Sequence, residues 1–311
     1  MRPMRELLRI LPVAALPLLV PSCAESLDLD RFTRSGAAIN QVPTSVTLFD
    51  LRFSCRSMQS HVNEYLELRV VDKAFRVQAK AVYVDIQQPD FSIYLSKIIP
   101  KANPPYHIDF WADHNNTNKY DGIEGGIDEK DHAWRRTIDP TWTSDPSLLS
   151  QLPEDIKFEG TTFDFNFLHD TNFVDIFTDA EGRPIATDAD GNAVDPSKDL
   201  LPFDLKLINT EPVLGKMVEV RVVEKESGRL VGLHRQGIVR QDYTPQILSI
   251  LDSGTVYEIS IFADIDGNGK FSEGDPSWKT EITSTRDGIT NPFDLGTPNS
   301  PIETGEPAPT P

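Results

Sequence analysis

The feature that most constrains the fold of this chain is an internal duplication. Four short runs from the first half recur, in the same order, in the second half. They pair Phe49-Asp-Leu-Arg-Phe with Phe203-Asp-Leu-Lys-Leu, 66–73 with 218–225, 106–113 with 257–264, and Asp131-His-Ala-Trp with Asp275-Pro-Ser-Trp. Four ordered matches do not arise easily by chance, so the sequence indicates two homologous units built on one plan.

Both units consist of short runs that alternate apolar with polar residues or are rich in β-branched and aromatic residues. The runs are 46–53, 65–71, 81–84, 91–95, 107–111, 134–138 and 163–167, followed by 203–208, 218–223, 230–233, 247–251, 257–262 and 278–282. The best helix candidate, 146–152, is short. This pattern predicts an all-β fold with two tandem antiparallel β-sandwich (Ig-like) domains, in which calcium-loop-like connections link some of the strands.

The duplication and the composition together divide the 311 residues. We expect a lipoprotein signal peptide at 1–22, a flexible tether at 23–41 and a first β-sandwich domain at 42–176. A hairpin linker at 177–199 follows, because it contains two near-copies of a turn-rich unit. A second β-sandwich domain at 200–297 precedes a disordered Pro-rich tail at 298–311.

The N-terminal segment predicts export. Arg2, Arg5 and Arg9 precede an apolar run at 10–20 that is too short to span a membrane confidently, and Val-Pro-Ser-Cys ends at Cys23. This segment resembles a bacterial lipoprotein signal. The resemblance implies lipidation of Cys23 and a lipid-anchored position at the outer membrane or cell envelope, either periplasmic or surface-exposed. An ordinary secretory signal cleaved nearby is the alternative.

Charge and cysteine content narrow the classes of partner. The formal net charge of -18 argues against nucleic acid, because binding phosphates requires clustered Lys and Arg. Contact with a membrane is expected through the lipid anchor at Cys23. Beyond the signal, Cys55 is the one remaining cysteine, so no internal disulfide is expected. Its strand-like surroundings predict a buried thiol without reactivity.

The second unit contains a twelve-residue stretch, 264–275, with the spacing of an EF-hand calcium loop. The expected ligands at positions 1, 3, 5, 9 and 12 are Asp264, Asp266, Asn268, Ser272 and Asp275, with the backbone carbonyl of Lys270 at position 7. Strands flank the loop, and Asp rather than Glu closes it. These features predict calcium at the modest affinity of extracellular modules, with a Kd of about 10⁻⁴–10⁻³ M. A metal-free Asp/Gly-rich turn is the alternative.

The first unit carries a less regular version of the same loop. Asp113, Asn115, Thr117 and Asp121 occupy positions 1, 3, 5 and 9. Strict spacing selects Glu124 as the closing carboxylate, whereas alignment with Asp275 selects Asp131. The alignment favours Asp131, because 122–130 can bulge out as an insertion. We predict calcium in this loop too, and both Asp131 and Glu124 remain candidates for the closing ligand.

Histidines are distributed unevenly between the two units. Five of the six lie in the first unit, namely His61, His107, His114, His132 and His169. Because His114 and His132 lie in or beside the loop, zinc or copper is an alternative to calcium there. Their spacings match no His-rich zinc pattern. Calcium is therefore the predicted cofactor, and His132 is expected to form local hydrogen bonds.

Several runs in 44–176 resemble a known repeat. They are Tyr106-His-Ile-Asp-Phe-Trp-Ala-Asp-His-Asn, Lys119-Tyr-Asp, Asp131-His-Ala-Trp-Arg and His169-Asp-Thr-Asn-Phe. Together they are similar to a repeat of secreted and surface-anchored bacterial proteins. The second unit keeps only the Asp loop and Trp278. The resemblance implies a strand-rich extracellular module and brings no catalytic residues.

The leading functional hypothesis is a surface-anchored, calcium-stabilised, non-enzymatic binding or structural module of the bacterial cell envelope. A protein or glycan ligand would bind at its surface, where Trp111, Trp134 and Trp142 are candidates unless they belong to the core. The sequence contains no His-Glu-x-x-His, Gly-x-Ser-x-Gly, phosphate-binding Gly-rich loop or Cys-x-x-Cys motif. An extracellular glycan-active hydrolase with paired carboxylates is the alternative, and a subunit of a larger envelope assembly is a third hypothesis.

Overall fold

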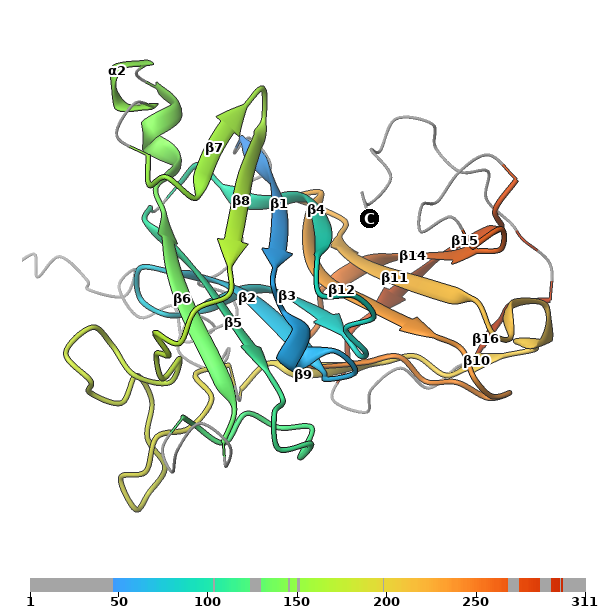
Figure 1. Cartoon of the computed structure of the whole chain (residues 1–311). Coiled ribbons are helices and arrows are strands. Elements are labelled where there is room, and N and C mark those ends of the chain that lie inside the picture. Colours follow the sequence, from blue (N-terminus) through green and yellow to red (C-terminus); the bar gives the residue numbers. More distant parts are fainter. Residues whose placement is uncertain are drawn as a thin grey trace, which may run out of the picture. The chain divides into compact units, whose positions relative to one another are not determined.

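Figure 1 shows a computed structural model of the chain, which describes residues 47–102, 104–123, 130–144, 146–149, 152–197, 199–267, 274–285, 292–296 and 298. Several predicted features lie outside these residues: the signal peptide, Cys23, the tether, the tail beyond residue 298, and the loop residues Glu124, Asn268, Lys270 and Ser272. Within the described part of the chain, no helix has the length and apolar character needed to cross a bilayer.

The largest element is an eight-stranded sheet in the order β15-β14-β11-β12-β3-β2-β5-β6. The first repeat supplies β2 (Leu66–Asp72), β3 (Val77–Tyr83), β5 (Tyr106–Ala112) and β6 (His132–Ile138); the second supplies β11 (Met217–Glu224), β12 (Arg229–Gly237), β14 (Val256–Asp264) and β15 (Ser277–Thr283). Neighbours pair antiparallel except β12 and β3, which run parallel. The sheet therefore continues from one repeat into the other.

Smaller sheets accompany the large one. Four strands lie in the order β4 (Phe91–Pro100), β1 (Leu48–Arg56), β8 (Thr162–Leu168) and β7 (Ile156–Glu159), and two pairs join β13 (Gln246–Leu251) to β9 (Leu201–Asp204) and β10 (Leu207–Ile208) to β16 (Phe293–Asp294). Strands β1 and β8 pair in parallel. The helical turns are η3 (Gln59–His61), η4 (Pro140–Ser144), α2 (Pro146–Leu149) and η5 (Glu211–Val213). Strands thus far outnumber helical turns among the described residues, and the fold is mostly β, as the sequence predicts.

Two main apolar clusters are buried, one largely from each repeat, because alternate strand residues point to the same face. Leu230 and Leu233 of β12 join the first cluster, and Val82 of β3 joins the second. In the first repeat, Phe110 stacks on Trp134 with ring centroids 5.3 Å apart and meets Phe167 edge-on at 4.8 Å. In the second, Trp278 belongs to a separate cluster that includes Tyr257. The two duplicated tryptophans are 0% and 1% exposed. The duplication therefore preserves a core position on equivalent strands.

The opposite face of the first repeat's half of the large sheet carries buried charges. Arg69 and Lys80 are each 1% exposed, which is unusual for these residue types. The segment 174–197 lies against them: Asp195 pairs with both, the Arg69 guanidinium lies 5.3 Å from the Phe177 ring centroid, and Arg135 donates hydrogen bonds to two carbonyls of the segment. Strand β2 is consequently buried on both faces.

Within this segment, each of the two turn-rich units closes on itself. Isolated bridges join Thr178 to Pro184 and Thr187 to Ala193. Asp179 and Asp188 occupy equivalent places, and each accepts backbone hydrogen bonds from the residues two and four positions further on. The linker is therefore two successive closed turns.

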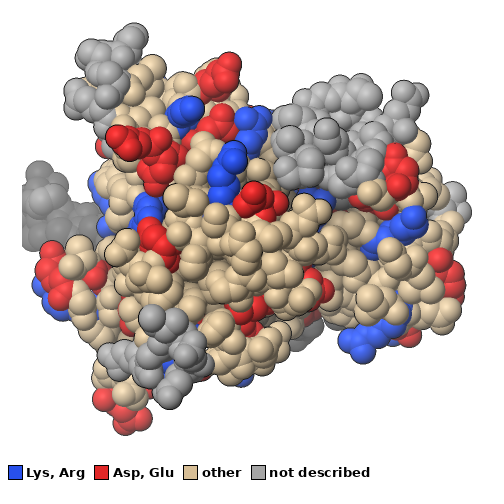
Figure 2. Space-filling model, in the orientation of Figure 1, with Lys and Arg blue, Asp and Glu red and all other residues tan. Residues whose placement is uncertain are grey.

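Every run expected to be a strand contains one in the structure. The run 203–208 is divided into β9 and β10, and two strands, β7 and β16, were not expected. The described part of the helix candidate is the single turn α2. On the face that Figure 2 shows, Lys and Arg are interspersed with Asp and Glu, and the described residues form no continuous basic surface there.

Candidate metal sites

The described part of the second loop brings three predicted ligands together. Asp264 ends β14, Asp266 follows it, and Asp275 precedes β15; one carboxylate oxygen from each lies within 4.8 Å of the others. Asp275 Oδ1 accepts a hydrogen bond from the Ile265 amide (2.9 Å), and Asp264 Oδ1 accepts one from the Gly267 amide (2.8 Å). Three carboxylates this close repel one another, so a bound cation would stabilise the arrangement.

Asp131, the closing candidate that the alignment favours, contacts the backbone of the first loop. Its Oδ2 accepts a hydrogen bond from the Asp121 amide (3.0 Å), whereas Asp275 accepts one from Ile265, near the start of its own loop. Asp113 accepts the amides of Thr117 (2.9 Å) and Asn118 (2.7 Å), which folds the loop back over its first residue. The competing candidate Glu124 lies outside the described residues.

Two predicted ligand oxygens in this first loop are buried without a hydrogen-bond partner: Asn115 Oδ1 and Asp131 Oδ1. Asp131 is 1% exposed. Burial, together with the charges of Asp121 and Asp113, raises the pKa of Asp131 to about 7. Buried polar oxygens usually have partners, and a hard cation is one partner that would satisfy both.

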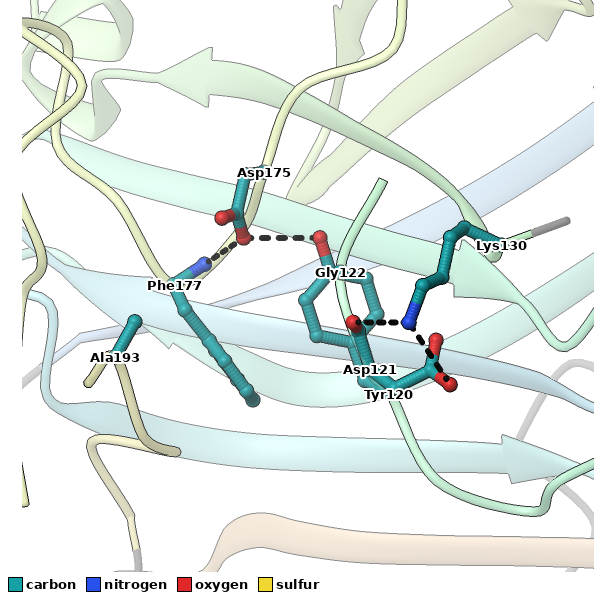
Figure 3. A pocket seen from close by; sticks show the side chains of 7 residues that line it. All are labelled: Tyr120, Asp121, Gly122, Lys130, Asp175, Phe177 and Ala193. Atoms are coloured by element: carbon teal, nitrogen blue, oxygen red, sulfur yellow. Dashed lines mark hydrogen bonds and ion pairs between the residues drawn. The ribbon is translucent and has the colours of Figure 1, made fainter. Parts of the chain in front are cut away.

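A pocket of about 350 Å³ separates the first loop from the linker (Figure 3). Tyr120, Asp121, Gly122 and Lys130 line one side, and Asp175, Phe177 and Ala193 line the other. Tyr120 donates a hydrogen bond to Asp175 (3.0 Å), and Lys130 pairs with Asp121 at 3.5 Å. The Tyr120–Asp175 hydrogen bond thus ties the loop to the segment 174–197, whereas the Lys130–Asp121 pair lies within the loop.

The tryptophans proposed as ligand contacts belong mainly to the core. Trp111 is 3% exposed and Trp134 is 0% exposed. Trp111 packs against Tyr65 and Tyr120, at centroid distances of 5.3 and 5.6 Å. The side chain of Trp142 lies outside what the structure describes. Neither of the two described rings therefore offers a glycan platform.

A third cluster comes from histidines that the sequence did not bring together. His61, His132 and His169 present ring nitrogens within 4.8 Å of one another, and Glu64 bonds to His61 and to His114. His107 lies apart from this group, with its Nδ1 3.1 Å from Thr137 Oγ1 and its ring stacked on Phe75. The one sequence signal for this cluster is the concentration of histidines in a single repeat.

Comparison with known proteins adds no family assignment. No protein-family model matches the chain, and no curated protein matches it significantly in sequence. The functional inferences below therefore depend on the chain's own residues.

Proposed function

We propose that this protein is a lipid-anchored, non-enzymatic binding or structural module of the bacterial cell envelope, with two β-sandwich repeats whose loops are held by calcium. The observation that carries the proposal is the convergence of Asp264, Asp266 and Asp275 within 4.8 Å. Calcium prefers oxygen ligands, and carboxylates from both ends of one loop would fix that loop between its strands.

The first loop gives independent support. Asn115 Oδ1 and Asp131 Oδ1 are buried without partners, and both were assigned as ligands from spacing or alignment alone. An ion there would also favour the charged form of Asp131 against the burial that raises its pKa to about 7. Since the pocket beside this loop is shared with the linker, calcium would also stabilise a potential binding surface.

The proposed cellular location follows from the N-terminal sequence. Cys23, lipidated after cleavage of 1–22, would tether the repeats to the outer membrane through 23–41. Metabolic labelling with a fatty acid tests this directly: the wild-type chain is expected to incorporate label, and Cys23→Ser is expected to lose it. Equal labelling of both would contradict the anchor without bearing on calcium.

Thermal unfolding with calcium and with a chelator tests the loops. For a Kd of 10⁻⁴–10⁻³ M, 10 mM calcium would stabilise the folded state by about 1.4–2.7 kcal/mol per loop. That corresponds to a rise in Tm of roughly 3–10 °C per loop. An unchanged Tm at 10 mM calcium would refute the proposal.

Matched variants separate the two loops. Asp275→Asn and Asp131→Asn each remove one closing carboxylate at nearly constant volume, and each is expected to reduce the calcium-induced shift. The control is Asp242→Asn, since Asp242 is an exposed carboxylate paired only loosely with Lys206 at 3.8 Å. Its calcium response should equal that of the wild-type chain. Magnesium at the same concentration controls for general screening by divalent ions.

The alternative hydrolase has weaker support. A glycosidase needs an acid of raised pKa that faces its substrate. Asp131 has such a pKa, but it is buried and does not line the pocket, whose carboxylates are Asp121 and Asp175. The proposal therefore assigns Asp131 to the loop rather than to catalysis.

A further inference from the structure

Three histidines from separate parts of the first repeat converge on one point. His61 ends η3, His132 begins β6, and His169 directly follows β8. His61 Nε2 lies 3.2 Å from His169 Nε2 and 3.3 Å from His132 Nδ1. We propose that these three nitrogens bind one first-row transition-metal dication of the zinc type, at a site distinct from the proposed calcium loops.

The spacing of the nitrogens matches a metal centre. Two nitrogens bound to a tetrahedral zinc ion at 2.0–2.1 Å are ~3.3 Å apart. Hydrogen bonding alone explains the arrangement less well, because His61 Nε2 has a single lone pair or a single proton to share. It can therefore bond to one of these two nitrogens at a time, whereas an ion at the centre would bind all three together.

Glu64 selects the His61 tautomer that a metal needs. Its Oε2 lies 2.6 Å from His61 Nδ1, so the His61 proton belongs on Nδ1, where it donates to the carboxylate. The lone pair of His61 is then on Nε2, facing His132 and His169. A carboxylate that holds the distal nitrogen of a metal-bound histidine is a common outer partner in metal sites.

The same distances exclude Glu64 from the ligand set. Its oxygens lie 2.6 Å from His61 Nδ1 and 2.8 Å from His114 Nδ1. These are hydrogen-bond separations, shorter than the ~3.3 Å between two ligands of one tetrahedral ion. Glu64 is therefore a positioning residue, and through His114 it also connects the cluster to the first loop.

Aromatic packing holds the rings in place. His132 lies between two parallel neighbours, Phe173 at a centroid distance of 4.1 Å and His114 at 4.5 Å. The edge-on ring of Trp134 contacts both His61 and His169 at 5.7 Å. Preorganised ligands lose little rotamer freedom on binding, so this packing favours high affinity.

The second repeat shows that the histidines are not required by the loop. Ile265 follows Asp264 where His114 follows Asp113, and Pro276 follows Asp275 where His132 follows Asp131. That repeat builds its acidic cluster without them. The imidazoles are thus specific to the first repeat, as expected for a ligand site added to a common scaffold.

The chemistry and the exposure of the cluster indicate which ion fits. Imidazole nitrogens suit zinc, copper and related ions, whereas calcium takes oxygen ligands. His61 is 0% exposed and His132 is 5% exposed, but His169 is partly exposed, so an ion would enter beside it. Three protein ligands leave a fourth position for water or an outside ligand.

Calorimetric titration of zinc chloride into the full chain tests the site, with 5 mM calcium present to occupy the acidic loops. One equivalent is expected to bind. Glu64→Gln should lower the affinity roughly 10- to 100-fold, the range for outer partners of a metal ligand. His169→Gln, which removes a ligand, should lower it further. The matched control His107→Gln should bind like the wild-type chain, because His107 lies outside the cluster.

Two further measurements make the result unambiguous. In metal-free buffer, His169→Gln is expected to unfold at the wild-type temperature, since this side chain is partly exposed and follows the end of β8. Cobalt(II) should give the wild-type chain the visible absorption of a four-coordinate site, a readout that requires no variant. Absence of zinc binding, zinc that calcium displaces, or a site that survives His169→Gln would each overturn the proposal. A parallel titration with copper(II) then shows which of zinc and copper binds more tightly.

Discussion

The buried contact between the linker and the large sheet allows a quantitative prediction for Asp195→Asn. Asp195 Oδ1 lies 3.4 Å from Arg69 Nη1, and Oδ2 lies 3.5 Å from Lys80 Nζ. Both cations are 1% exposed, and Glu67, at 3.7 Å from Lys80, is the other carboxylate paired with them in the described structure. Removal of one charge would leave two buried cations with one partner, which is costly in a low-dielectric interior.

The pKa of Asp195 sets the magnitude. Burial acts to raise it, but Lys80, Arg69 and the hydrogen bonds from Ser197 together outweigh burial and lower it from 3.8 to about 2. The difference between 3.8 and about 2 corresponds to about 2.4 kcal/mol at pH 7. Because a third of the Asp195 side chain is exposed, solvent screening reduces this figure to roughly 1–2 kcal/mol.

The sign of the pH dependence follows from the lowered pKa. The contribution of Asp195 is fully present above its unfolded value and is lost as the pH falls through about 2. Urea unfolding of Asp195→Asn and the wild-type chain should therefore differ at pH 7, with the gap falling to about half by pH 3. Asp190→Asn, at an exposed position in the same linker, is the control and should match the wild-type chain. A pH-independent gap, or none at pH 7, would refute the reasoning.

Two further predictions concern β12, the strand at the junction of the repeats. A Cβ added at Gly232 would lie 2.5 Å from Ile250 Cδ1, so Gly232→Ala should destabilise the fold by about 1–3 kcal/mol, measured by urea unfolding. The control is Gly237→Ala on the same strand, where an added Cβ meets no atom within 4 Å, so this change should be nearly neutral. Burial lowers the pKa of His234 to about 4, below its unfolded value, so the fold favours the neutral form. Stability should therefore fall by about 2.6 kcal/mol as the pH drops from 6.5 to 4. His234→Gln should flatten this part of the stability profile; an identical slope in the variant would contradict the assignment.

The sequence predicts local structure well and long-range pairing poorly. Period-two alternation identifies β1 and β14 because one face of each strand is more deeply buried than the other. β7 and β16, of four and two residues, are too short to show a period. The parallel pairing of β12 with β3 joins residues about 150 positions apart, and no local pattern specifies that choice.

The candidate metal sites show the same contrast between local patterns, which the sequence reveals, and long-range contacts, which it does not. The convergence of Asp264, Asp266 and Asp275 could be predicted because these residues are close in sequence. The preference for Asp131 over Glu124 rests on comparison with Asp275 and stays a prediction. The histidine cluster could not be predicted from spacing, since His61 and His169 are 108 positions apart. They meet because β1 and β8 pair in parallel, which places the His169 amide 3.0 Å from the Arg56 carbonyl.

The two proposed metal sites of the first repeat share neighbouring residues, which predicts that they are coupled. Asp131 is a proposed calcium ligand and His132 a proposed zinc ligand, and both are buried at the start of β6. Calcium that fixes Asp131 would also fix the backbone that carries His132, so less ordering would remain for zinc to impose. Zinc affinity should therefore rise on the order of fivefold between calcium-free buffer and 5 mM calcium, and calcium affinity should rise by the same factor with zinc.

Two variants isolate this coupling. Asp131→Asn should abolish the calcium dependence of zinc affinity while zinc still binds, because its histidine ligands are retained. Asp266→Asn, in the second loop, should leave the dependence intact, since no histidine follows Asp264 or Asp275 there. If zinc bound equally well with and without calcium, the two sites would be independent, and the adjacency of Asp131 and His132 would have no energetic consequence. A dependence that survived Asp131→Asn but not Asp266→Asn would place the coupling in the other repeat and contradict the mechanism.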